Sequence, residues 1–100
     1  MPEAEQPIAC SLTPGQLAER RAQLVPGLME RAAEVTDLDD GLRMRFESRA
    51  GLLAELATII EQERTCCSFL RFAITVEPAG GAVHLDVTGP AGTREFLRAL

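Results

Sequence analysis

The feature that most constrains the fold is a strict alternation of apolar and polar residues in three segments. The pattern occupies residues 42–47, 70–77 and 83–88. A two-residue period places one row of side chains on the buried face of a strand and the other row in solvent. A sheet that is buried on both faces shows continuous apolar runs instead. The chain therefore predicts an antiparallel sheet that helices cover on one face only.

Helical spacing of apolar residues predicts three further segments. A first helix is expected from about residue 14 to residue 33. Pro26 followed by Gly27 predicts a kink or break in it, because proline removes a backbone donor. A second helix is expected over 48–67, where Leu and Ile recur at helical positions after a serine that can cap it. A short terminal helix near 96–100 folds back on the core.

The connecting segments complete the expected order of elements. An alternating pattern at residues 8–12 predicts the first strand, the aspartate-rich stretch 37–41 predicts a turn, and residues 78–81 predict a hairpin connection. Residues 1–6 are expected to be frayed, and residues 7–100 to form a single domain. The predicted fold class is α+β, in the order β-α-β-α-β-β-α. It is an open-faced sandwich with a four-stranded, mainly antiparallel sheet and two to three helices on one face.

Charge and hydropathy exclude several classes of partner. The net charge is −5 and the basic residues are interleaved with acids, which argues against binding nucleic acid. No apolar run approaches the ~20 residues that span a bilayer, so no membrane association is expected. The N-terminal residues are acidic where a signal peptide would be basic, which favours a cytoplasmic location. In that reducing compartment the cysteines stay thiols.

The adjacent pair Cys66 and Cys67 is the strongest chemical signal in the sequence. The pair stands where the second helical pattern gives way to a strand, and Cys10 is the remaining cysteine of the chain. Thiolates bind soft ions such as Hg(II), Cu(I) and Zn(II), and a site needs two to four converging ligands. We therefore expect Cys10, Cys66 and Cys67 to form a metal or thiophile site if folding brings them together.

Two physical conditions limit this hypothesis. Neighbouring residues on a helix point about 100° apart, so Cys66 and Cys67 can share one ion only if the helix unwinds between them. Free cysteine is also among the most buried residue types, so core packing alone is an alternative explanation. Redox catalysis is less favoured, because a helix C-terminus disfavours the thiolate and the pair lacks the spacing of redox motifs.

Three other side chains are candidate members of the site. Glu63 precedes the pair on the same side of the helix and is a candidate oxygen ligand or base, although such residues are more often solvated or salt-bridged. Arg64 is a candidate to tune the thiols. His84, the single histidine, falls on the polar face of its strand and is expected at the surface rather than at a metal. With no recognisable base and nucleophile, an enzyme is the least favoured class.

The polar face of the predicted sheet offers a different function. Its basic and acidic residues are compatible with a surface that docks a protein partner or a second copy, or equally with cross-strand ion pairs on a solvated face. The alternative reading is thus an interaction or accessory domain with structural cysteines. The charged residues of this face are Arg43, Arg45, Arg71, Glu47, Glu77 and Asp86.

The cysteine segment also resembles a known group. The text ERTCCSFLRFAITVEPAGG, followed by VHLDVTGPAGTREFL, resembles a poorly characterised family of small bacterial proteins with an E-R-x-C-C-x-F-L-x-F motif. Related segments are similar to C-terminal extensions of some mercury-resistance-type regulators. The resemblance covers about residues 8–98 and implies metal-linked biology. The chain lacks the DNA-binding helices of such regulators, so a stand-alone regulator is not implied.

Overall fold

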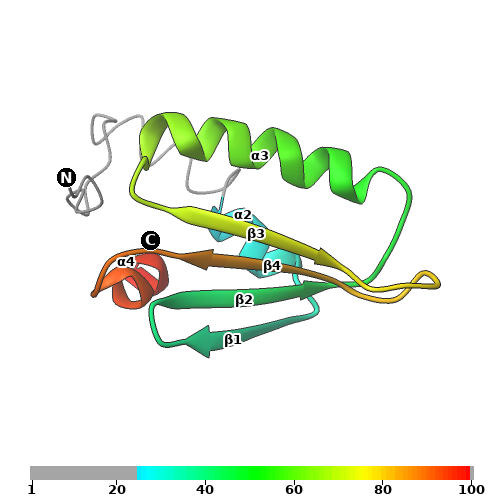
Figure 1. Ribbon diagram of the computed structural model, residues 1–100, viewed down its shortest axis with the longest axis horizontal. Coiled ribbons are helices and arrows are strands. Elements are labelled where there is room, and N and C mark those ends of the chain that lie inside the picture. Colours follow the sequence, from blue (N-terminus) through cyan, green and yellow to red (C-terminus); the bar gives the residue numbers. More distant parts are fainter. Residues whose placement is uncertain (1–24, 100) are drawn as a thin grey trace.

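The computed structural model describes residues 25–99 as an α+β sandwich (Figure 1). The prediction of an open-faced fold with a four-stranded antiparallel sheet is confirmed, and the strands lie in the order β1-β2-β4-β3. In the described part, the elements follow the chain as α-β-β-α-β-β-α. Their bounds are α2 (Val25–Arg31), β1 (Glu34–Leu38), β2 (Gly41–Phe46), α3 (Leu52–Cys66), β3 (Arg71–Val76), β4 (Val83–Thr88) and α4 (Thr93–Ala99).

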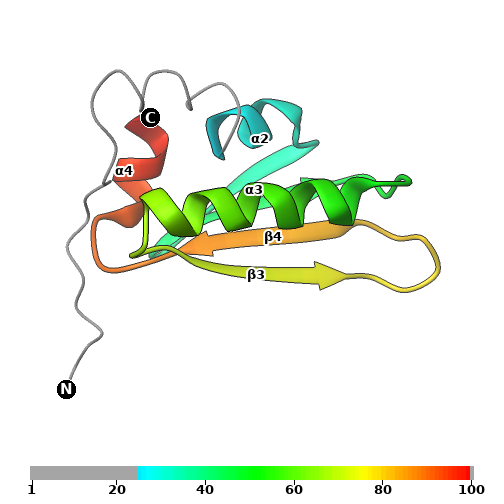
Figure 2. The ribbon, with the colours of Figure 1, turned by 90° about the horizontal axis from the view of Figure 1, so that it is seen from above.

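The alternation in the sequence sets the register of the sheet. Met44 of β2 lies opposite Leu85 of β4, which in turn lies opposite Ile74 of β3. Met44 and Leu85 are fully buried, so the apolar rows of the central strands share the face that carries the helices. Figures 1 and 2 show α3 running along this face, with α2 beside it. One apolar core joins the sheet to all three described helices. Its buried members are Val25, Leu28, Leu42, Met44, Phe46, Leu52, Leu56, Ile59, Cys67, Phe69, Val83, Leu85, Val87 and Leu97.

Gly41 allows a close approach between β2 and β4. It begins β2 directly after the turn from β1 and lies opposite Thr88. A Cβ atom at this position would stand 1.9 Å from the carbonyl oxygen of Val87 and 2.8 Å from the Cα of Thr88. Because both of those atoms belong to the backbone, no side-chain rotation relieves the overlap. The two central strands therefore require glycine at this point.

Strand β1 corrects the predicted element order. The sequence indicates a turn over 37–41, whereas the structure continues β1 through Asp37 to Leu38 and confines the turn to two aspartates. The sequence did not predict this strand because β1 is an edge strand whose side chains are all exposed or half-buried. It therefore lacks the alternation of apolar and polar residues that marks the central strands. The first predicted helix also ends earlier, at Arg31. The strand predicted at 8–12 lies outside the described residues.

The outer strand β3 departs from its predicted burial. Its apolar row was expected to face the core, but Ile74 is 38% exposed and Val76 is 55% exposed. Leu70 and Phe72, at the start of this row, pack partly against the core. In the described sheet β3 is the outermost strand on its side, so it has a neighbouring strand on one side only. Among the described helices none is long and apolar enough to cross a membrane.

Candidate functional site

The cysteine pair stands where helix α3 ends. Cys66 is the last helical residue, and Cys67 has backbone angles of φ −128° and ψ 71°, outside the helical region. The Cys67 N–H still donates to the carbonyl oxygen of Glu63 at 2.7 Å, which closes the final helical turn. The Cys67 carbonyl then accepts a bond from the Leu70 N–H at 3.1 Å. The chain therefore leaves the helix between the two cysteines, within one residue of the predicted end.

Cys67 belongs to the core of the protein. It is 4% exposed and lies in the same apolar cluster as Phe69, which also faces the end of α4. The ring of Phe69 meets the ring of Phe96 edge to face, with 5.2 Å between their centroids. Such a contact is a favourable arrangement for aromatic pairs. The segment that carries Cys67 is thus anchored to the core.

Glu63 is buried beside this segment and contacts the start of α2. Its side chain is 3% exposed, and its carboxylate oxygen Oε2 accepts a hydrogen bond from the Val25 N–H at 3.0 Å. A buried carboxylate requires such partners, because an uncompensated charge in the core is costly. A hydrogen bond to a charged group contributes about 1.5–3 kcal/mol. Glu63 therefore links α3 to α2, whereas the sequence predicted it only as an oxygen ligand or base beside the thiols.

The three predicted ligands are described to different extents. The prediction for Cys10, and that for the side chain of Cys66, lie outside the described part of the structure. Within that part, no group of three or more His, Cys, Asp or Glu side chains converges as a metal site requires. Arg64, the residue expected to tune the thiols, is exposed on α3. The convergence of three thiols accordingly stays a prediction.

His84 lies on the polar face of the sheet, as its position in the alternation predicts. Its neighbours on the adjacent strands are Arg45 and Thr75. Its Nδ1 atom stands 3.9 Å from the Oε2 atom of Glu77. This face is turned away from the core that contains Cys67. His84 therefore belongs to the polar surface rather than to the thiol segment.

Ion pairs between strands occupy the charged face of the sheet. Arg43 binds both carboxylate oxygens of Asp86, at 2.7 and 2.9 Å, and Arg45 lies 3.3 Å from a carboxylate oxygen of Glu34. The hydrogen bond from Arg43 lowers the pKa of Asp86, and the same bond raises the pKa of Arg43. These contacts correspond to the alternative that the sequence left open for this face, cross-strand pairing within one chain.

A second polar cluster, which the sequence did not indicate, lies at the opposite end of α3 from the cysteines. Glu55 pairs with Arg31 at 2.9 Å and with Arg49 at the other carboxylate oxygen. The hydrogen bond from Arg49 is the largest cause of a lowered pKa at Glu55. The cluster borders a cavity of about 370 Å³. The three charged residues of the cluster come from α2, from the segment before α3 and from α3, so no spacing of neighbouring residues in the sequence indicates the cluster. The cavity is lined by Leu28, Arg31, Ala33, Phe46, Glu47, Arg49, Leu52 and Glu55.

Comparisons with protein-family models, with curated proteins and with solved structures gave no significant match. The resemblance of the cysteine motif to a bacterial family therefore stays a prediction.

Proposed function

We propose that this chain is a small cytoplasmic protein that binds a soft metal ion, or a comparable thiophilic ligand, through Cys66 and Cys67 with Cys10 as third ligand. The observation that carries the proposal is the end of α3 between the paired cysteines. On a continuous helix the two thiols would diverge by about 100°. The non-helical backbone of Cys67 removes that restriction.

The surroundings of Cys67 also favour a metal ligand. Its side chain is buried among apolar residues, where a coordinating sulfur is shielded from water. Metal coordination is strengthened when the surrounding shell controls solvent access. The carbonyl oxygen of Glu63, one helical turn earlier, accepts the hydrogen bond from the Cys67 N–H and fixes the backbone of Cys67 at the end of the helix. Thiophilic cations of the Hg(II), Cu(I) or Zn(II) type match these donors.

The test is an anaerobic titration of the fully reduced protein with Hg(II), Cu(I) and Zn(II). Binding is followed by sulfur-to-metal absorption and by proton release, since thiols lose protons when they bind a metal. We expect one tight equivalent for the wild type and at least ~10-fold weaker binding for Cys10→Ser and for the double variant Cys66→Ser, Cys67→Ser. Ser11→Ala is the control beside Cys10 and should bind as the wild type does.

Two results would overturn the proposal. Weak, non-stoichiometric binding by the reduced wild type would exclude a specific metal site. Equal affinity in the Cys10→Ser variant and the wild type would exclude a three-thiol sphere. Circular dichroism of each variant separates loss of binding from loss of folding.

The second candidate is an interaction domain whose cysteines are structural. The charged face supports it poorly, because Arg43 and Arg45 are already paired within the chain. The apolar residues left exposed at the β3 edge support it better. A protein partner, or a second copy of the chain, is therefore better sought at this edge than on the open face.

A further inference from the structure

The open edge of the sheet at β3 has the properties of a pairing surface, and they do not depend on the thiol site. Strand β3 is the outermost strand on its side and has the sequence RFAITV, with a single charge and no proline. Its residues Ile74 and Val76 are exposed apolar side chains. An apolar edge strand of this kind is a template for a further strand.

The backbone of β3 also offers its hydrogen-bonding groups on this edge. The Glu77 N–H donates to the carbonyl of Ala82 at 3.1 Å, so Glu77 turns its backbone toward β4. Backbone groups alternate sides along a strand. Phe72, Ile74 and Val76 therefore turn their N–H and C=O groups away from β4, toward the open edge. Of the described strands, β3 thus presents apolar side chains and available backbone groups together.

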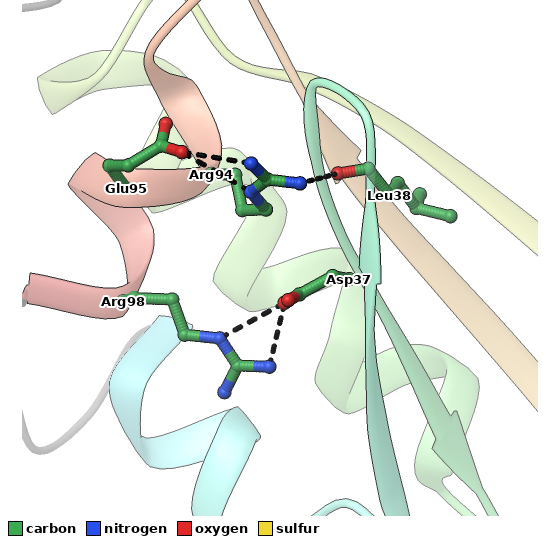
Figure 3. A network of polar contacts seen from close by, with 5 residues as sticks. All are labelled: Asp37, Leu38, Arg94, Glu95 and Arg98. Atoms are coloured by element: carbon green, nitrogen blue, oxygen red, sulfur yellow. Dashed lines mark hydrogen bonds and ion pairs between the residues drawn. The ribbon is translucent and has the colours of Figure 1, made fainter.

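The opposite edge strand, β1, is bound at its turn end by side chains of α4. Figure 3 shows the arginines of this helix reaching β1. Arg98 binds the carboxylate of Asp37 at 2.8 Å, and Arg94 donates to the carbonyl oxygen of Leu38 at 3.4 Å. Charged side chains are one of the usual means of blocking an edge strand, and β1 carries two of them, Glu34 and Asp37. Of the two edge strands of the described sheet, β3 carries fewer charges than β1 and is therefore better suited to pair with another strand.

Helix α3 extends the apolar surface beside β3. Leu53 is 45% exposed near the start of α3, and Ile60 lies two turns later, half-buried at the margin of the core. Both lie on the flank of α3 away from α2, because Glu55 marks the α2 side through its ion pair with Arg31. Figure 2 shows α2 and β3 on opposite sides of α3. Leu53 is thus exposed on the same side of α3 as β3, and we call the exposed residues Leu53, Ile74 and Val76 the apolar strip.

We propose that the occupant of this strip is a second copy of the chain, with its β3 antiparallel to the first about a two-fold axis. A register that places Ile74 opposite its own copy aligns Phe72 with the second copy's Val76. It also aligns Arg71 with the second copy's Glu77, on the solvent face. Opposite charges directly across two strands stabilise the pair. The edge is therefore complementary to itself in its apolar row, its backbone groups and its charges.

Alternative registers lose this match. A shift of one residue would place apolar side chains of one copy opposite the polar row of the other. A shift of two residues keeps the faces aligned but sets Arg71 opposite Thr75, or brings Pro78 into the ladder. Arg71 makes no ion pair with any residue that the structure describes, and Glu77 has only His84, at 3.9 Å. Both charges are thus available to the second copy.

Charge reversal gives a sharp test, measured by light scattering and sedimentation from micromolar to millimolar concentration. We expect the wild type to form a dimer and the single variants Arg71→Glu and Glu77→Arg to dissociate at concentrations where the wild type does not, with at least ~10-fold weaker association. An equimolar mixture of the two variants should dimerise, since every cross-strand pair is then of opposite charge. Glu30→Arg, on α2 at the far side of α3, is the matched control and should remain dimeric.

Amide hydrogen exchange supplies the second readout. In the dimer the Ile74 N–H should be protected in proportion to protein concentration, and Ile74→Arg should abolish both the dimer and the protection. A wild type that stays monomeric would overturn the proposal. Protection of Ile74 in that monomer would instead assign the edge to a segment of the same chain. Retained association of Ile74→Arg, or no association in the mixture of charge variants, would overturn it as well.

Discussion

Replacement of Gly41 by alanine should be among the most damaging single-methyl changes in this protein. The added Cβ would lie 1.9 Å from the Val87 carbonyl oxygen, whereas Cβ atoms essentially never approach another atom closer than 3.0 Å. The difference of about 1.1 Å must be absorbed by separating β2 from β4. The neighbouring Leu42 and Val87 are both fully buried, so this separation also opens the core.

The cost can be built from its physical parts. Overpacking of a well-packed interior costs about 1–3 kcal/mol. A ladder hydrogen bond that is stretched beyond its normal length loses about 1 kcal/mol more. The lower entropy of alanine in the unfolded chain returns about 0.4–1 kcal/mol. We therefore expect the free energy of unfolding of Gly41→Ala to fall by about 2 kcal/mol.

Urea denaturation, followed by circular dichroism, measures this loss. With a slope of about 1–1.5 kcal/mol/M, a loss of about 2 kcal/mol should lower the midpoint by about 1.3–2 M relative to the wild type. Gly51→Ala is the control: it has a left-handed φ of +85° and no atom within 4 Å of the added Cβ, so its cost is backbone strain of about 1 kcal/mol. Equal losses in the two variants would refute the steric argument for Gly41.

Three further predictions concern single side chains. Truncation of Leu85, which is fully buried on a central strand, should lower the free energy of unfolding in Leu85→Ala by about 3 kcal/mol in the same assay; a loss below ~1 kcal/mol would contradict its place in the core. Glu63→Ala should lower the free energy of unfolding by about 1–3 kcal/mol and speed hydrogen exchange of the Val25 amide. Glu63→Gln keeps an acceptor oxygen and should lose less stability; a larger loss in Glu63→Gln than in Glu63→Ala would contradict the hydrogen bond. The hydrogen bond from Arg43 holds the pKa of Asp86 below its ordinary value of 3.8, so the ion pair stabilises the fold fully above that pH and loses this contribution as the pH falls through the lowered pKa. Asp86→Asn should therefore lose less stability on acidification than the wild type does, and an unchanged pH profile would contradict the pairing.

The periodicity of the sequence predicted the central part of the fold because burial there is governed by local pattern. Strands β2 and β4 each carry an uninterrupted apolar row, and the apolar spacing of α3 matched its observed end to within one residue. Strand β1 failed because its pairing with β2 depends on tertiary context rather than on its own alternation. The exposure of Ile74 could not be read from the sequence either, since an edge strand and a central strand can have the same pattern.

The candidate site was predictable only where it is local. The sequence located the end of α3 at the cysteine pair because helical and strand periods meet there. It gave no sign that Glu63 would bind the backbone of Val25, since that contact joins residues 38 positions apart. The same distance problem applies to Cys10, whose approach to the pair depends on the path of the whole chain.

The contacts of α4 with β1 have a consequence for the size of any assembly. A sheet with two usable edges can add copies without limit, and such growth leads to ribbons and fibrils. Arg94 and Arg98 engage the turn end of β1, and β1 itself carries the charges of Glu34 and Asp37, so this edge is less suited than β3 to receive another strand. A two-fold pairing through β3 would use that edge in both copies, so such an assembly would stop at two chains unless β1 also paired.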